Sequence, residues 1–178
     1  MTRPALPAAL LATAPIFALA LLPAAVVATP DLAAPAPPGH PVESCAECHF
    51  DGPPLVDSPA ISLVDPAGHY AAGETHVLTV HLALAEGETG GFLAALWRED
   101  GAAGTLAAGD GTAARDAAVI SAPPVRAATA DGLRWSFAWT SPEAPGTVHL
   151  QLAANAGNGD QSPLGDTLHA QTIPLAVR

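Results

Sequence analysis

The chain has no lysine, because all six of its basic residues are arginine. Its 17 acidic residues bring the formal net charge to −11 at pH 7. A surface of this sign repels the phosphate groups of nucleic acids and of anionic membranes. The composition therefore excludes nucleic acid as a partner. The negative charge suits a redox partner protein with a basic docking face. Alternatively, it serves only to keep the protein soluble.

Methionine and cysteine are scarce. Met1 is the only methionine, and Cys45 and Cys48 are the only cysteines. There is also no phosphate-binding loop, no Ser/His/Asp order that stands out and no pair of carboxylates in a recognisable frame. The sequence is therefore more typical of an electron carrier or a binding module than of an enzyme. Its chemistry is concentrated at the two cysteines.

The pentapeptide Cys45-Ala46-Glu47-Cys48-His49 matches C-x-x-C-H, the attachment sequence of a c-type haem. Two thiols at this spacing can reach the two vinyl groups on one edge of a porphyrin and add across them as thioethers. The next side chain then points back at the iron, so His49 is predicted to be the proximal ligand. The motif predicts one covalent haem c.

Other uses of the two cysteines remain open. An oxidising compartment would allow a Cys45–Cys48 disulfide, and the pair with His49 could also belong to another metal site. A thioredoxin-like redox pair normally begins the helix of a βαβ unit, and no such pattern surrounds Cys45. We favour haem over these alternatives.

The amino terminus resembles an export signal. Residues 1–28 begin with a charged end at Arg3, continue with an apolar run, and close on the small residues Val26-Val27-Ala28. This pattern predicts cleavage before Thr29 and a periplasmic or extracellular protein with a net charge of −11 − 1 = −12. The alternative is an uncleaved membrane anchor.

Proline and glycine divide the next part of the chain. Together they number 19 + 16 = 35, which predicts many turns and little long helix. Residues 29–44 are predicted to be an extended Pro/Ala-rich linker, and residues 45–68 an irregular haem-attachment segment. No helix of useful length fits between Phe50 and Gly68, so the helical fold of a class I cytochrome c is excluded.

Alternation of apolar and polar residues begins near Thr75 and predicts an all-β domain over residues 69–178. Strands are predicted at His76–Leu84, Phe92–Trp97, Gly104–Ala108, Ala117–Ser121, Leu133–Trp139, Thr147–Ala154 and Thr167–Val177. Pro174 is expected to break the last strand or to place it at an edge. Seven to nine short strands separated by turns predict an immunoglobulin-like β-sandwich, with Trp135 and Trp139 in its core.

Three stretches of the domain resemble a known family. They are Tyr70–His76, Gly90–Leu96 and Trp135–Pro142, and they are followed by a Gly/Asn-rich loop at 155–159. Together they resemble the bacterial choice-of-anchor V domain, a relative of the Reeler domain. The resemblance implies an exported Reeler-like sandwich, often preceded by C-x-x-C-H. A His-Thr pair of the family is replaced here by Arg126-Ala127-Ala128-Thr129, so no iron ligand can come from that position.

The distal side of the iron has few candidate ligands. Met1 leaves with the signal peptide, which excludes a His/Met haem within this chain. The other histidines are His40, His69, His76, His81, His149 and His169. We predict His69, because it follows His49 by 20 residues at the end of a Pro-rich loop that can fold over one haem face. His40 and His149 are the alternatives.

A weaker pattern is the Gly-rich loop that contains Asn155, Asn158, Asp160 and Asp166. Its oxygen atoms could bind Ca²⁺, but the same residues are typical of tight turns, and we favour turn chemistry. The sequence thus predicts a monohaem electron carrier. One alternative is a non-redox binding or structural module. Another is a haem sensor or small enzyme with an open iron position.

Overall fold

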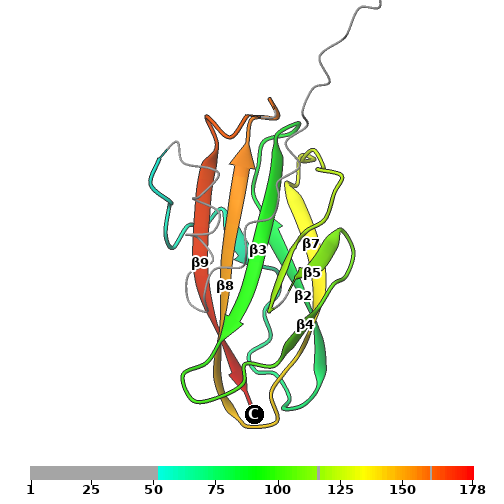
Figure 1. Ribbon diagram of the computed structural model, residues 1–178, viewed down its shortest axis with the longest axis vertical. Coiled ribbons are helices and arrows are strands. Elements are labelled where there is room, and N and C mark those ends of the chain that lie inside the picture. The colour runs from blue at the N-terminus through cyan, green and yellow to red at the C-terminus, as the bar shows by residue number, and fades with distance from the viewer. Residues whose placement is uncertain (1–51, 116, 161) are drawn as a thin grey trace, which may run out of the picture.

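The computed structural model describes residues 52–115, 117–160 and 162–178. These residues form two antiparallel sheets packed face to face (Figure 1). The described part of the chain contains no helix that could cross a membrane. The strands are β1 (Ile61–Leu63), β2 (Thr75–Leu82), β3 (Thr89–Trp97), β4 (Thr105–Ala107), β5 (Thr112–Arg115), β6 (Ala118–Ser121), β7 (Leu133–Thr140), β8 (Gly146–Gly157) and β9 (Thr167–Val177).

The two sheets share one core and differ in size. One sheet has the order β1-β2-β7-β4, and the other has the order β5-β6-β3-β8-β9. Both consist of antiparallel neighbours, which can present one face to a core and the other to water. The predicted all-β sandwich of seven to nine strands is therefore confirmed.

The period-two pattern decides which side chains enter the core. On β2, Leu78 and Val80 face inward, and they lie opposite Phe137 and Trp135 of β7. Trp139 is fully buried, and its indole N–H donates to the carbonyl of Ala103 at 3.0 Å. The expectation that the two tryptophans of β7 belong to the core is confirmed.

Two strands carry weaker sequence signals and were not predicted. β1 is only three residues long and lies in a Pro-rich region, yet Ile61 is fully buried and the strand pairs with β2. β5 has no long apolar side chain, and it forms by pairing with β6. The sandwich therefore includes residues that the sequence left within the segment 45–68.

β9 is an edge strand, as Pro174 led us to expect. Its outward-pointing backbone groups bind other parts of the chain near both ends: Leu168 and Ala170 bind Leu55, and Ala176 binds Tyr70. Pro174 lies an even number of residues from each of these β9 residues, so its backbone nitrogen, which carries no hydrogen, faces the open edge of the sheet. The proline therefore removes no hydrogen bond to β8. The proline is compatible with an unbroken strand only at this edge.

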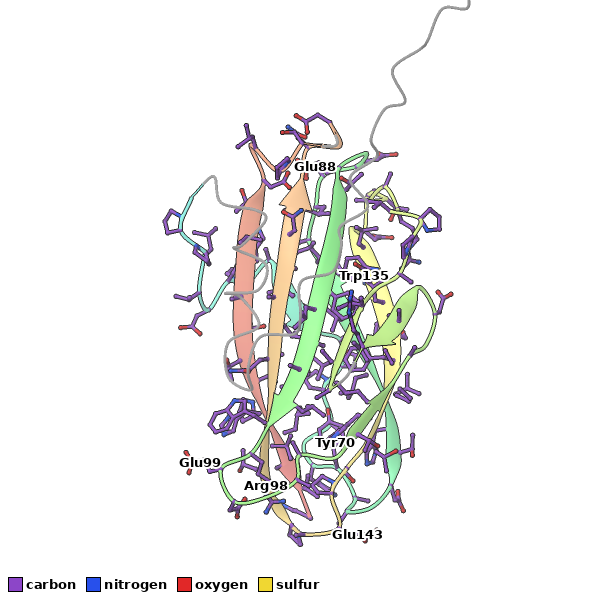
Figure 2. All side chains as sticks on the ribbon, in the orientation of Figure 1. Tyr70, Glu88, Arg98, Glu99, Trp135 and Glu143 are labelled. Atoms are coloured by element: carbon purple, nitrogen blue, oxygen red, sulfur yellow. The ribbon has the colours of Figure 1, made fainter. Side chains whose placement is uncertain are left out.

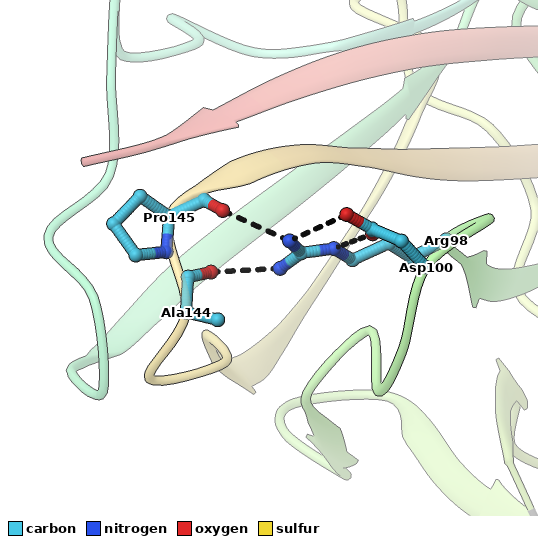
Figure 3. A network of polar contacts seen from close by, with 4 residues as sticks. All are labelled: Arg98, Asp100, Ala144 and Pro145. Carbon is cyan, nitrogen blue, oxygen red and sulfur yellow. Dashed lines mark hydrogen bonds and ion pairs between the residues drawn. The ribbon is translucent and has the colours of Figure 1, made fainter.

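The loop after β3 is fastened to the turn before β8. The Arg98 guanidinium donates to the carbonyl oxygens of Ala144 at 2.7 Å and Pro145 at 2.8 Å (Figure 3). It also forms an ion pair of 2.5 Å with Asp100. The Arg98 side chain is only 6 % exposed, whereas that of Asp100 is 74 % exposed. The two carbonyl bonds therefore hold this end of the sandwich.

Candidate functional site

The predicted haem ligands and thioethers, Cys45, Cys48 and His49, lie outside the described residues, as does His40. The described chain begins at Gly52, three residues after His49. Residues 52–58 are here called the edge segment.

The edge segment lies beside β9 (Figure 1). The N–H of Leu55 donates to the carbonyl of Leu168 at 2.8 Å, and the N–H of Ala170 donates to the carbonyl of Leu55 at 2.9 Å. The N–H of Ser58 donates to the carbonyl of Ala170 at 3.1 Å. Three backbone bonds thus fix this segment on the edge strand, with Leu55 directly opposite His169.

His169 is the ionisable residue nearest to this junction along the strand. It lies opposite Ala154 of β8, whose side chain belongs to the core, so His169 faces the inner side of the sheet. Its Nδ1 lies 2.8 Å from the hydroxyl oxygen of Ser58, a residue that is only 4 % exposed. Burial lowers the pKa of His169 below its usual value of 6.5 and favours a neutral imidazole.

The edge segment also exposes apolar side chains. Leu55 is 48 % exposed and Val56 is 70 % exposed. Both residues directly precede Asp57 and Ser58, and Leu55 lies beside His169. An apolar planar group attached a few residues upstream could cover them and remove this surface from water.

His69, the predicted distal ligand, is exposed. Its neighbour Tyr70 pairs with Val177, eight residues along β9 from His169. Eight residues of strand span roughly 26 Å. Tyr70 and Arg98 lie toward the carboxy-terminal end of β9 (Figure 2). The structure thus brings His169, rather than His69, next to the edge segment.

The remaining histidines have local partners. His149 stacks on Trp97 with ring centroids 4.4 Å apart and an interplanar angle of 14°. His76 packs edge-on against Tyr70, with ring centroids 5.1 Å apart. A ring nitrogen of His81 lies 2.9 Å from the carbonyl oxygen of Asp131. None of these three contacts involves the edge segment.

A hollow of about 350 Å³ lies between β2 and the loop that follows β1. His76 and Tyr70 contribute to its lining, together with Leu63, Leu78 and Val77. His69 is not among its lining residues. The hollow therefore gives no support to His69 as a ligand.

The Gly-rich loop uses its polar groups internally. The N–H groups of Asp160 and Ser162 donate to Asn158 and Asp160 side chains at 2.9 and 2.7 Å. The Asn155 amide donates to Asp166 at 2.9 Å. The first two are the local bonds of Asx turns, whereas the third spans 11 residues, and Oδ1 of Asn155 is buried with no hydrogen-bond partner among the described residues. The calcium alternative remains a prediction, which calcium titration can test.

Within the described ranges, no three His, Cys, Asp or Glu side chains gather as a metal site. A haem iron needs fewer protein ligands, because the porphyrin nitrogens supply its equatorial positions. Beside the edge segment the described residues offer one imidazole, that of His169, and the exposed apolar side chains of Leu55 and Val56. The haem that the motif predicts stays a prediction.

No protein-family model matches the chain, and none of the curated proteins compared with it matches either. Among solved structures, the Reelin-N domain of F-spondin is 21 % identical, with a TM-score of 0.53 over 75 % of this chain and 96 % of that one. The chain has a Reeler-like fold. A human F-spondin reeler-domain fragment is 20 % identical over 67 % of this chain and 88 % of its own, with a TM-score of 0.47. At these identities the likeness to Reeler domains shows the fold alone.

Sequence reasoning placed His169 among six candidates but did not select it. One signal was available. In the strand 167–177, Ile173, Leu175 and Val177 share the core-facing parity, and His169 has the same parity. This parity predicts that the His169 side chain is partly buried. The sequence did not show that the edge segment lies against β9 at His169.

Proposed function

We propose that the protein is an exported, monohaem c-type cytochrome-like protein that transfers electrons. Cys45 and Cys48 would hold the haem through thioethers, and His49 would be its proximal ligand. The observation that carries the proposal is the complete C-x-x-C-H motif, which uses both cysteines of the chain. When bound, the haem supplies an iron that accepts and returns one electron.

The described residues support this function in two ways. The edge segment is held on β9 by three backbone bonds, so a haem attached just upstream would be carried by a rigid sandwich. Leu55 and Val56 are exposed apolar side chains close in sequence to the motif, which a bound haem could shield from water. The predicted mature charge of −12 suits a redox partner with a basic face.

We further propose that the chain is a relative of the choice-of-anchor V domain, on the three sequence stretches that resemble it. The Reeler-like fold supports this relationship at the level of architecture. A periplasmic or cell-surface location follows from the predicted export signal.

A second candidate is a non-redox binding or structural module with a Cys45–Cys48 disulfide. One observation favours it. The large core cluster draws its members from the sandwich itself, so the described domain does not depend on haem for its core. In that case the motif would only form a disulfide within the segment 45–68.

Absorption spectroscopy and a haem stain of a denaturing gel separate the two candidates. The full chain is expressed for export in a host with c-type haem maturation, beside the matched variant Cys45→Ser/Cys48→Ser. We expect a haem stain that survives denaturation and a c-type reduced spectrum in the parent chain alone. A colourless parent chain with a Cys45–Cys48 disulfide would support the structural module instead.

A further inference from the structure

We propose that residues 75–78 of β2, together with the hollow beside them, bind an extended, basic peptide segment of a partner protein. The peptide pairs with β2 as an added strand, places an apolar side chain in the hollow and directs a basic side chain toward Asp65. The site is independent of haem, since every residue in it belongs to the described sandwich.

β1 leaves this part of β2 unpaired. In the order β1-β2-β7-β4, β1 is the neighbour of β2 on the side away from β7. It pairs with residues 80–82 of β2, and a last bond of 2.8 Å runs from the N–H of Val64 to the carbonyl of Thr79. Residues 75–78 pair with β7 on one side and have no described strand on the other.

A turn at Asp65 ends the pairing of β1. Asp65 has a φ of 44°, in the left-handed region that residues other than glycine rarely adopt. Pro66 follows and has no N–H to donate. The chain then crosses to β9, where the N–H of Tyr70 donates to the carbonyl of Ala176 at 2.8 Å. The turn therefore takes the chain away from β2 and leaves a gap beside residues 75–78.

The backbone of Val77 points into this gap. Alternate residues of a strand direct their N–H and C=O groups to the same side. The carbonyl of Thr79 is bound by Val64 on the β1 side, so Val77, two residues earlier, directs both of its groups to that side. Neither group has a hydrogen-bond partner among the described residues. An unpaired N–H and C=O at a strand edge are the groups to which an added strand binds.

The hollow of about 350 Å³ suits the side chains of an added strand. Leu63, Tyr70 and Leu78 give it a lining of buried apolar residues. Successive side chains of a strand point to opposite faces. One set would therefore enter the hollow, and the other would lie beside the Val77 side chain, which is 74 % exposed. An apolar residue in the first set would be removed from water.

The charge around the hollow selects a basic peptide. Asp65 is the only acidic residue among the described residues that line it, and no lysine or arginine is among them. Glu74, which directly precedes β2, is also exposed. Positive side chains at the ends of the peptide would be attracted to these carboxylates. A second copy of this chain is disfavoured as the occupant, because both copies would carry a net charge of −11.

The test measures the binding of fluorescein-labelled peptides Arg-Thr-X-Thr-X-Thr-Arg, in which X is Val, Leu or Phe, to the full exported chain by fluorescence anisotropy. We expect at least one peptide to bind saturably. Val77→Pro removes the N–H that an added strand would use, and it should weaken binding by at least about tenfold. β2 should tolerate this proline, because Pro174 faces the open edge of β9 in the same way.

Two further variants separate the backbone contact from the side chains. Val77→Thr keeps the N–H and should bind as the parent chain does. Asp65→Asn retains a residue that adopts the left-handed conformation but removes the charge. It should bind the basic peptide about two- to fivefold more weakly.

Absence of saturable binding by every peptide would overturn the proposal, and so would equal affinity for the parent chain and Val77→Pro. If the circular dichroism spectrum shows that Val77→Pro is misfolded, two peptides N-methylated on alternate residues decide with the parent chain. One of the two should no longer bind, and undiminished binding of both would refute the added strand. A concentration-dependent dimer of the parent chain that Val77→Pro abolishes would assign the edge to a second copy and overturn the proposal.

Discussion

The hydroxyl oxygen of Ser58 lies 2.8 Å from Nδ1 of His169, across 111 residues of sequence. This contact joins the segment that follows the C-x-x-C-H motif to the edge strand of the larger sheet. It accompanies the backbone bonds of Leu55 and Ser58 to the same strand. The contact therefore helps to hold residues 52–58 on β9 at His169.

Replacing Ser58 with alanine should weaken this junction. The substitution removes the bond to His169 and a bond of 3.3 Å from the N–H of Ala60. We expect the free energy of unfolding to fall by about 1 kcal/mol, because one partner of a buried hydrogen bond is lost. Urea denaturation measures the change. Ser62→Ala in β1 is the matched control, since the Ser62 hydroxyl has no bond to the described residues, and equal losses in both variants would contradict the prediction.

The stability of the haem-free protein should depend on pH through His169. Burial lowers the folded-state pKa below 6.5, so at moderately acidic pH the unfolded chain binds a proton that the folded chain does not. The contribution of this residue is present above pH 6.5 and is lost as the pH falls toward the folded pKa. Urea denaturation of the Cys45→Ser/Cys48→Ser protein, with and without His169→Gln, measures it. We expect a shallower loss on acidification in the Gln variant; identical pH profiles would be inconsistent with a lowered pKa.

Trp139→Phe should destabilise the core. Trp139 is fully buried, bonds the Ala103 carbonyl and packs edge-on against Tyr70 with centroids 5.2 Å apart. The smaller ring leaves that carbonyl without its bond and opens a cavity, so we expect a loss of about 1–3 kcal/mol. Trp97→Phe is the control, because the Trp97 N–H has no partner among the described residues. A loss in the control as large as in Trp139→Phe would refute the role given to the Ala103 bond.

Arg98→Lys should lower the midpoint of thermal unfolding more than Asp100→Asn. A lysine cannot reproduce the forked donation to the carbonyls of Ala144 and Pro145, whereas Asp100 contributes an exposed ion pair (Figure 3). Differential scanning calorimetry of the two variants makes the comparison. The opposite ranking would show that the ion pair, and not the carbonyl bonds, holds this loop.

Much of the fold could be predicted, because the alternation of apolar and polar residues along a strand shows which of its side chains are buried in the core. The bounds of β9 were predicted as observed, and the inward faces of β2 and β7 follow from their apolar residues. β1 and β5 could not be predicted, because three residues near prolines and a Thr-Ala-Ala-Arg run carry almost no periodic signal. Their pairing is decided by β2 and β6.

The candidate site, like the fold, has a part that the sequence predicts and a part that it does not. The motif at Cys45–His49 is local, so its spacing predicts its chemistry from sequence. The surroundings of the histidines depend on long-range contacts, since Leu55 and Ser58 meet β9 at His169 only when that strand has formed. Loop length predicts His69 as the distal ligand, and this stays a prediction; its neighbour Tyr70 pairs with Val177 near the carboxy-terminal end of β9.

The intact mass of the exported protein is the most direct test of the central claim, that Cys45 and Cys48 bind one haem covalently. The parent chain, purified under denaturing conditions, should have the mass of residues 29–178 plus one haem, and Cys45→Ser/Cys48→Ser should lack the added mass. A parent mass equal to that of the bare chain, less the two hydrogens of a Cys45–Cys48 disulfide, would contradict the claim.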